Sequence, residues 1–329
     1  MRRIISIGVG AALATVVSLA IPSVAMAATS TVVVSSANLV TGSPAPGDFV
    51  TVNQSSGIGG VGLVFGPSTP PLGTGSLQMT VAGTADHWSV YNYDHIGTRL
   101  SDLTSLGYST YSDNSTTAPV LQVEINPGNT SGTDAGVTYS TLNFEPYLQS
   151  PGLTTGTWQS WNVLAGVVWG SHLTGAPNST PLSWNSFVAT YPNATIKGGF
   201  GVNVGGNWSA MTGNADALTI GTPAQTTTYD FEAPFQVTTT SLPNATIRTA
   251  YSATLMANGG TSPYKWSIMS GSLPKGLHLN RTTGVISGTP ATSDSGTYTF
   301  TVGVVDKKIK VKHQPPTQHS ATKVLSISF

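Results

Sequence analysis

The sequence predicts an all-β protein made of two β-sandwich domains. The chain contains 37 glycines and 21 prolines in 329 residues, and both residue types form turns. Its apolar residues occur in short runs rich in threonine and valine, which is typical of strands and disfavours long helices. The balance of acidic and basic residues reverses along the chain, which indicates a domain boundary.

Charge divides the chain into two parts. Residues 28–235 hold 11 acidic and 2 basic side chains, whereas residues 236–329 hold 2 acidic and 9 basic ones. We therefore expect an acidic domain over 28–232, a linker over 233–240 and a basic domain over 241–329. Opposite net charges also favour self-association, or contact between the two domains.

Residues 1–27 have the pattern of a secretory signal peptide. Arg2 and Arg3 precede a short apolar run over 4–21, and Ala25 and Ala27 form a small-residue cleavage pattern. No second apolar run of this kind follows, so no membrane span is expected in the mature chain. We expect a secreted, extracellular protein; free secretion is the simpler interpretation, and any association with a cell surface would be non-covalent. With no cysteine, its domains depend on burial and hydrogen bonds.

Short β-prone runs separated by turn residues fill the acidic domain, as in sandwiches and barrels. In one of them, alternation places Leu121, Val123 and Ile125 on the same face, so Glu124 faces away from the core. The strands expected here are 75–83, 87–93, 120–126, 137–147, 196–204, 215–220 and 227–232.

Two short helical segments interrupt these strands. Apolar residues from Trp184 to Tyr191 follow helical spacing, and Ser183 precedes them as a candidate N-cap. A further turn or two of helix is expected over 100–106, with Gly107 as its C-cap. Both segments are expected to have structural roles.

The acidic domain resembles a known module in the segments 90–100 (VYNYDHIGTRL), 106–111, 158–161 and 216–220. On these segments it is similar to the jelly-roll-like β-sandwich module of uncharacterised bacterial secreted proteins. The resemblance implies a layout like that of carbohydrate-binding modules and lectin-type sandwiches, and no particular activity.

The basic domain contains YKWSI at 264–268, GVISGTP at 284–290 and GTYTFTV at 296–302. On these motifs it resembles the bacterial immunoglobulin-like (cadherin-like) domain of surface and secreted proteins. The resemblance implies an immunoglobulin-like β-sandwich. Alternation of Trp266 with its apolar neighbours also predicts a strand, with Trp266 in the core.

Aromatic residues supply a candidate carbohydrate-binding surface in the acidic domain. Trp158 and Trp161 are three positions apart, so in a strand they point to opposite faces and one of them is free to face solvent. Tryptophans and tyrosines of this kind also fill ordinary cores. We expect a sugar-binding surface that involves Tyr93, Trp161 or Trp208.

Asp94, His95 and Arg99 form a candidate polar cleft, for which a structural ion pair is the simpler interpretation. No serine in a Gly-x-Ser-x-Gly turn completes a triad with Asp94 and His95. The carboxylates of the acidic domain also lack the compact paired spacing of sandwich glycosidases. We therefore predict that the protein is not an enzyme.

Lys307, Lys308, Lys310 and Lys312 form a basic insertion before the last strand of the basic domain. A solvated, lysine-rich hairpin is one interpretation. The alternative is contact with an anionic partner such as a cell-wall polymer or an acidic polysaccharide. Nucleic acid is not expected, because no aromatic or recognition element is interleaved with the lysines.

No cofactor is predicted, although the oxygen-rich segments leave a structural calcium ion open. No EF-hand spacing is present. The candidate oxygen ligands are Asp113, Asn114, Asn126, Asn129, Asp134, Asp230 and Glu232.

Together these features predict a secreted, non-enzymatic recognition or adhesion protein that binds carbohydrate or a cell-surface polymer. Two alternatives stay open. One is a secreted carbohydrate-active enzyme, a polysaccharide hydrolase or lyase with an unrecognised site. The other is a structural component of a surface layer or matrix.

Overall fold

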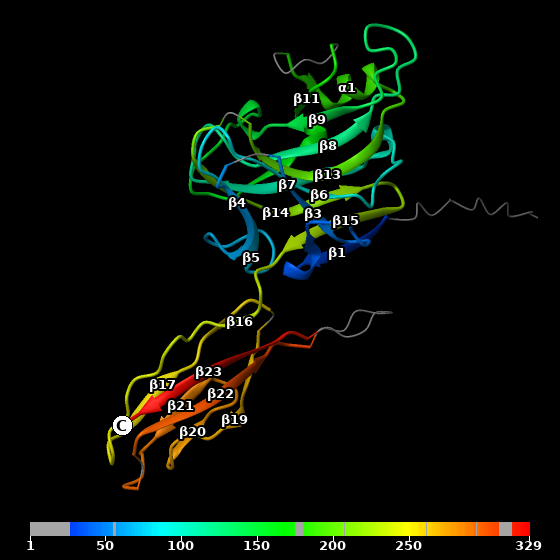
Figure 1. Cartoon of the computed structure of the whole chain (residues 1–329). Helices are drawn as coiled ribbons and strands as arrows, with labels where there is room; N and C mark the ends of the chain where they lie inside the picture. The colour runs from blue at the N-terminus through cyan, green and yellow to red at the C-terminus, as the bar shows by residue number, and fades with distance from the viewer. Residues whose placement is uncertain are drawn as a thin grey trace, which may run out of the picture.

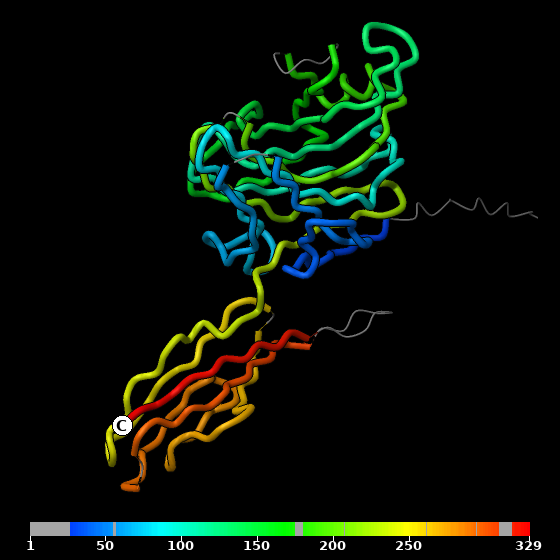
Figure 2. The backbone as a smooth tube through the Cα atoms, viewed as in Figure 1, coloured from blue at the N-terminus to red at the C-terminus, as the bar shows by residue number. Residues whose placement is uncertain are grey.

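The computed structural model forms two β-rich bodies with separate hydrophobic cores, joined by one crossing of the chain (Figures 1 and 2). Core residues of the larger body lie between Val34 and Phe231, and those of the smaller body between Val237 and Ile327. The all-β, two-sandwich fold class is thereby confirmed. The structure describes residues 27–54, 57–174, 180–206, 208–260, 262–293, 295–308 and 318–329. The predicted signal peptide, apart from Ala27, lies outside the described residues.

One sheet of the larger body has eight strands. In spatial order they are β12 (Leu182–Ser183), β11 (Val167–Gly170), β9 (Ser140–Phe144), β8 (Val120–Asn126), β13 (Thr195–Gly205), β6 (His87–Asn92), β3 (Phe49–Asn53) and β2 (Leu39–Val40). The alternation predicted for β8 is confirmed, because Leu121, Val123 and Ile125 are buried in the core. Glu124 lies on the outer face, where its carboxylate accepts hydrogen bonds from Gly199 N and the Tyr139 hydroxyl.

The other sheet has seven strands and is organised around β14 (Met211–Gly221). One edge of β14 pairs with β7 (Ser105–Ser112), and β10 (Gln159–Asn162) pairs with β7 in turn. The second edge is shared between two pairs of strands. These are β5 (Gly75–Val81) with β4 (Gly60–Phe65), and β15 (Gln225–Phe231) with β1 (Ala28–Val34), which runs parallel to β15.

The predicted helix after Ser183 is confirmed as α1 (Trp184–Thr190), and the Ser183 hydroxyl accepts a hydrogen bond from Ser186 N. The helix predicted over 100–106 is wrong. Only a 3-10 turn, η2 (Leu100–Asp102), forms there, and Gly107 lies inside strand β7 instead of capping a helix. The other short turns are η1 (Ser36–Asn38), η3 (Pro146–Leu148) and η4 (Val163–Ala165). No described helix is long and apolar enough to cross a membrane.

The smaller body packs two three-stranded sheets around its own core. Trp266 is 4% exposed, so its predicted place in the core is confirmed. One sheet contains β17 (Tyr251–Thr254), β21 (Val285–Gly288) and β20 (Leu277–Leu279), and the other contains β19 (Lys265–Gly271), β22 (Thr297–Val305) and β23 (Ser320–Ser328).

The stretch expected to be a linker, 233–240, contains a strand of the smaller body. This strand is β16 (Gln236–Val237), which pairs with β18 (Ala257–Asn258). Ala233 is buried and Phe235 packs against the second core. The connection between the two bodies is therefore shorter than the sequence suggested, because apolar residues on its C-terminal side join the immunoglobulin-like core.

Candidate functional site

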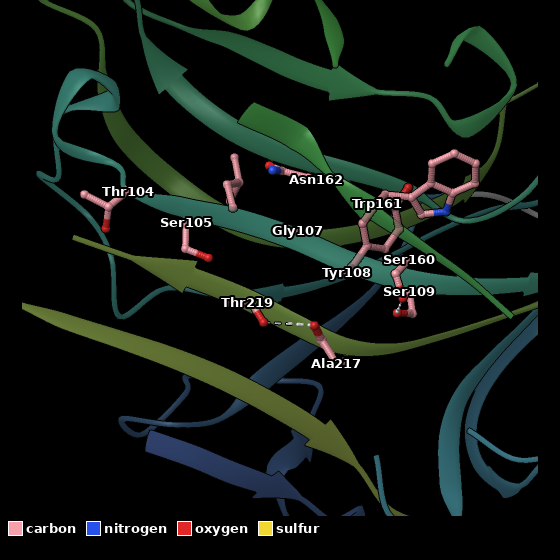
Figure 3. A pocket seen from close by; sticks show the side chains of 11 residues that line it. Thr104, Ser105, Gly107, Tyr108, Ser109, Ser160, Trp161, Asn162, Ala217 and Thr219 are labelled. Atoms are coloured by element: carbon pink, nitrogen blue, oxygen red, sulfur yellow. Dashed lines mark hydrogen bonds between the residues drawn. The ribbon is translucent and has the colours of Figure 1, made fainter. Parts of the chain in front are cut away.

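An open hollow of about 310 Å³ lies over β7, β10 and β14 (Figure 3). Side chains alternate between the two faces of these strands. Tyr108 and Trp161 point toward the core, whereas Ser109 and Ser160 point the opposite way, onto the outer face of the sheet. The residues that line the hollow are Thr104, Ser105, Leu106, Gly107, Tyr108, Ser109, Ser160, Trp161, Asn162, Ala217 and Thr219.

Small residues at paired positions create this hollow. Gly107 lies opposite Asn162, and a Cβ atom at position 107 would lie 2.5 Å from the carbonyl oxygen of Trp161. The absence of a side chain there allows β7 and β10 to lie close to each other and leaves the surface of the hollow low at this position. The hydroxyls of Ser109 and Ser160 are hydrogen-bonded across the two strands at 2.8 Å. The small residues on the outer face therefore leave a shallow surface, and the larger residues Leu106, Tyr108 and Trp161 also contribute to its lining.

A β-bulge shapes the side of the hollow formed by β14. The pairing of β14 with β7 shifts between Asp216 and Thr219, and Ala217 has a φ of 53°. Left-handed backbone is unfavourable for a residue other than glycine and recurs at functional sites. The Thr219 hydroxyl donates to the carbonyl oxygen of Ala217 and lies 3.0 Å from the hydroxyl of Thr228. The bulge is thus supported by side-chain hydrogen bonds.

Two half-buried aromatic residues continue the same face of the sheet beyond the hollow. Tyr111 lies two positions after Ser109 on β7, and Trp158 lies two positions before Ser160. Their ring centroids are 5.8 Å apart. The indole Nε1 of Trp158 donates a hydrogen bond to the carbonyl oxygen of Pro67, which holds the ring in one orientation. An oriented aromatic pair therefore stands next to Ser109 and Ser160 on the same face of the sheet.

The outer lining of the hollow carries no charged side chain. Its hydroxyl and amide groups both donate and accept hydrogen bonds, which suits a neutral ligand with many hydroxyl groups. Asp216, the nearest carboxylate along β14, is fully buried and accepts hydrogen bonds from Leu72 N and Phe231 N. Burial raises the pKa of Asp216 to about 6 despite these bonds. We interpret Asp216 as part of the framework beneath the hollow.

Trp161, which was predicted to belong to a sugar-binding surface, is one of the residues that line the hollow, but most of its side chain is buried. Trp161 is 8% exposed, and its indole Nε1 donates a hydrogen bond of 2.8 Å to the hydroxyl of Thr110. Its ring also packs beside Phe144 in the core. Of the two tryptophans with opposite orientations, Trp158 is the outward one. The spacing of the pair indicated opposite faces, but nothing local indicated which face the second sheet would cover.

The other two predicted sugar-binding residues lie apart from the hollow. Tyr93 follows β6 of the eight-stranded sheet, is half-buried and packs edge-on against Tyr91. Burial, and then the nearby charge of Glu124, raise the pKa of Tyr93. Trp208 packs partly buried against the first core. The structure therefore does not gather Tyr93, Trp161 and Trp208 into one surface.

The predicted polar cleft of Asp94, His95 and Arg99 does not converge on one point. Asp94 accepts hydrogen bonds from Gly47 N and the Asn92 amide, and His95 Nε2 lies 3.0 Å from the Tyr229 hydroxyl. Burial lowers the pKa of His95, although the charge of Asp94 opposes this. Arg99 is exposed and pairs through its backbone with Thr195. Across the described residues, the one ion pair joins His319 and Asp306, so the expected Asp94–Arg99 pair is absent.

Only part of the predicted basic insertion can be placed. Lys307 and Lys308 are exposed after β22, while Lys310 and Lys312 lie outside the described residues. The base of the insertion is tied down, because the buried carboxylate of Asp306 lies 2.8 Å from Nδ1 of His319. The two placed lysines are thus presented at a fixed point of the smaller body.

The predicted oxygen ligands do not assemble into a metal site formed by side chains alone. In the parts of the chain that the structure describes, no group of three or more His, Asp or Glu side chains is arranged to hold a metal ion. Asp134 is buried and accepts hydrogen bonds from Thr174 and from the Tyr191 hydroxyl. Asp113 accepts a hydrogen bond from Thr212 N at a strand end. These two carboxylates therefore have structural partners.

Comparison with known proteins identifies the smaller body. Residues 233–315 match the model of the family described as "Putative Ig domain". The chain therefore contains an immunoglobulin-like domain, as its motifs predicted. The match starts eight positions before residue 241, in agreement with the place of β16 in this domain. No curated protein matches the chain.

Several solved structures show weak similarity. Human protocadherin-24 EC1-2 has 13% identity and a TM-score of 0.25, with 41% of this chain and 73% of that chain covered. Drosophila N-cadherin EC1-4 has 16% identity and a TM-score of 0.23, and the match covers 40% of this chain and 38% of that chain. A Bacteroides fragilis protein described as a "putative alpha-galactosidase/melibiase" has 22% identity and a TM-score of 0.21. The match covers 30% of this chain and 18% of the Bacteroides fragilis protein. Similarities this low show no shared function.

Proposed function

We propose that the larger body is a non-enzymatic recognition module that binds a neutral polysaccharide in the hollow over β7, β10 and β14. The observation that carries this proposal is an uncharged, hydroxyl-lined hollow, with the oriented pair Tyr111 and Trp158 next to Ser109 and Ser160 on the same face of the sheet. In this proposal the protein is exported, and the immunoglobulin-like domain spaces or attaches the binding module at a surface.

The chemistry of the hollow matches that of a sugar chain. Serine, threonine and asparagine side chains exchange hydrogen bonds with sugar hydroxyls in either direction. The apolar face of a sugar ring packs on an aromatic ring such as that of Trp158. A volume of about 310 Å³ lies at the small end of ligand pockets, which suits a short segment of a longer polymer. The open shape lets the rest of the polymer extend beyond the hollow.

The composition of the hollow favours binding over hydrolysis. Glycoside hydrolysis ordinarily needs two carboxyl groups about 5–10 Å apart on either side of the scissile bond. No residue that lines the hollow has a carboxyl group. A ligand held there would meet hydrogen-bonding groups and an aromatic face, but no general acid and no nucleophile.

Two features outside the hollow support a role at an extracellular surface. The pattern of Arg2 and Arg3 before an apolar run and a small-residue site supports export. Exposed Lys307 and Lys308 on the immunoglobulin-like domain supply positive charge for contact with an anionic cell-wall polymer. The two domains would then contact chemically different polymers.

The test is a pull-down of the purified protein with insoluble neutral polysaccharides, followed by binding isotherms for the polymer retained. Trp158→Ala removes the aromatic face, and Ser160→Tyr fills the hollow from an exposed position. Each is expected to weaken binding at least about tenfold, a change of about 1.4 kcal/mol. Tyr139→Ala is the matched control, because Tyr139 is an exposed aromatic residue beside the other sheet.

Two results would contradict the proposal. Unchanged binding by both Trp158→Ala and Ser160→Tyr would place the site elsewhere, and loss of binding in Tyr139→Ala alone would point to the outer face of the eight-stranded sheet. Release of reducing sugar from any bound polymer would show that the protein is an enzyme.

A further inference from the structure

A cluster of carboxylates lies where β15 leaves the larger body toward the immunoglobulin-like domain. Asp230 is near the end of β15, and Glu232 directly follows this strand. Asp216 reaches the same region from β14, where its carboxylate accepts the hydrogen bond from Phe231 N. These residues are brought together by strand pairing, and the cluster is separate from the lining of the hollow.

The loop between β4 and β5 closes over this cluster. Thr74 donates hydrogen bonds to Glu232 from its backbone N, at 2.7 Å, and from its hydroxyl. Gly73 has a φ of 52°, and a Cβ atom at this position would lie 1.3 Å from Oε1 of Glu232 and 3.2 Å from Oδ1 of Asp230. The carboxylate oxygens of Asp230 and Glu232 therefore lie side by side against the backbone of Gly73. Only glycine leaves room for them there.

Apart from a hydrogen bond with Glu232 that requires a shared proton, Asp230 has an oxygen that no group in the described structure satisfies. The residue is only 9% exposed, and its Oδ1 atom is buried without a hydrogen-bond partner. A buried polar atom without a partner costs on the order of 1–3 kcal/mol, and more when it carries charge. The position of Oδ1 beside Glu232 directs this unsatisfied atom into the cluster.

Among the described residues, no ion pair compensates this negative charge. Residues 28–235 contain only two basic residues, Arg99 and Lys197. Arg99 is exposed and pairs through its backbone with Thr195, and Lys197 donates to the carbonyl oxygen of Thr138. Among the described residues, the sole ion pair lies in the immunoglobulin-like domain. A second positive species is therefore required to hold the Asp230 and Glu232 carboxylates together when both are ionised.

We infer that Asp230 and Glu232 bind a hard divalent cation of the calcium class. Such ions take about 6–8 oxygen ligands, which include main-chain carbonyl oxygens and water as well as carboxylates. Because the described residues contain no metal-holding group of three or more acidic or histidine side chains, main-chain carbonyl oxygens and water would have to supply the remaining ligands. The bound cation ties the Gly73–Thr74 turn to the end of β15. It thereby stiffens the point at which the chain passes to the immunoglobulin-like domain.

The experiment uses the full mature protein after treatment with EDTA and removal of the chelator. Calcium binding at pH 7.5 is measured by isothermal titration calorimetry with CaCl2 alone, in parallel with the thermal midpoint. We expect one bound ion per chain and a higher midpoint, since a ligand specific for the folded state stabilises it by mass action. Asp230→Asn and Glu232→Gln are each expected to weaken binding at least tenfold and to abolish the shift in midpoint. Asp102→Asn, which alters an exposed carboxylate elsewhere, is the control and should bind as the parent does.

Absence of calcium binding in the parent protein overturns the inference and leaves a shared proton as the means by which the cluster is neutralised. Binding that persists unchanged in both Asp230→Asn and Glu232→Gln also overturns it, because the ion then lies elsewhere. Circular dichroism of each variant without calcium separates loss of binding from loss of folding. Since the cluster is not part of the hollow, failure here leaves the polysaccharide proposal intact.

Discussion

Trp158 and Trp161 differ in role although only three positions separate them. Trp161 fills the core and hydrogen-bonds to Thr110, whereas Trp158 lies on the outer face and is oriented by Pro67. Large buried aromatic side chains contribute strongly to stability because their removal leaves a cavity. A half-buried ring at the surface contributes less to stability and is available to a ligand.

Trp161→Ala is expected to lower the free energy of unfolding by about 3–5 kcal/mol, the range for removal of a buried aromatic side chain. Trp158→Ala should cost less than about 1.5 kcal/mol while it weakens polysaccharide binding. Urea denaturation monitored by circular dichroism measures both. Equal losses of stability in the two variants would contradict the assigned orientations.

The buried carboxylates Asp216 and Asp230 predict an unusual dependence of stability on pH. Burial raises the pKa of Asp216 to about 6, and burial together with Glu232 and Asp216 raises that of Asp230 to about 7. Both values exceed the ordinary range of about 4, so the folded state holds these protons more tightly than the unfolded state. Their stabilising contribution is therefore complete below about pH 4 and is lost as the pH rises through about 6–7.

In the presence of EDTA, we therefore expect the thermal midpoint temperature to decrease as the pH is raised from 5 to 8. Scanning calorimetry across this range measures the effect. Asp216→Asn combined with Asp230→Asn should flatten the profile, because the titrating groups are then gone. A midpoint that rises over this interval in the parent protein would contradict the assignment.

At the scale of elements, β7 shows why local patterns misled. Leu100, Leu103 and Leu106 are all buried and have helical spacing, yet a 3-10 turn followed by a strand satisfies the same burial. Gly107 was read as a helix cap, but its lack of a side chain serves the close approach of β10. Such a cross-strand requirement depends on a partner, Asn162, that is distant in the sequence.

Gly107→Ala is expected to lower the free energy of unfolding by about 1–3 kcal/mol, because the added Cβ would lie 2.5 Å from a backbone oxygen that cannot move alone. Gly62→Ala in β4 is the matched control, since no atom lies within 4 Å of a Cβ at that position. Chemical denaturation of both variants provides the measurement. A cost at Gly62 as large as that at Gly107 would show that glycine in a strand, and not the contact with β10, is what matters.

At the scale of the whole molecule, the chain forms two hydrophobic cores that have no buried residue in common. The first core ends with Phe231 and the second begins with Val237. Cores with no shared residues are expected to unfold as separate cooperative units. The short connection nevertheless keeps the larger body close to the immunoglobulin-like domain (Figure 1).

Scanning calorimetry of the mature protein is therefore expected to show two transitions. Trp266→Ala removes a ring that is 4% exposed in the second core and should lower only one of them. Trp161→Ala should lower the other. If either substitution shifts both transitions equally, the two bodies unfold as one unit and the domains are energetically coupled.

Sequence patterns were enough to predict the all-β class, the strand over 120–126, the Ser183 cap and the core position of Trp266. Each of these follows from local alternation, local capping or a motif carried by consecutive residues. Tertiary structure alone decided that Trp158 and not Trp161 faces outward, and that Gly73 meets Asp230 and Glu232. A strand pattern shows that two side chains lie on opposite faces, but the packing of the second sheet decides which face is buried. Likewise, charges distant in sequence become neighbours only through the pairing of strands.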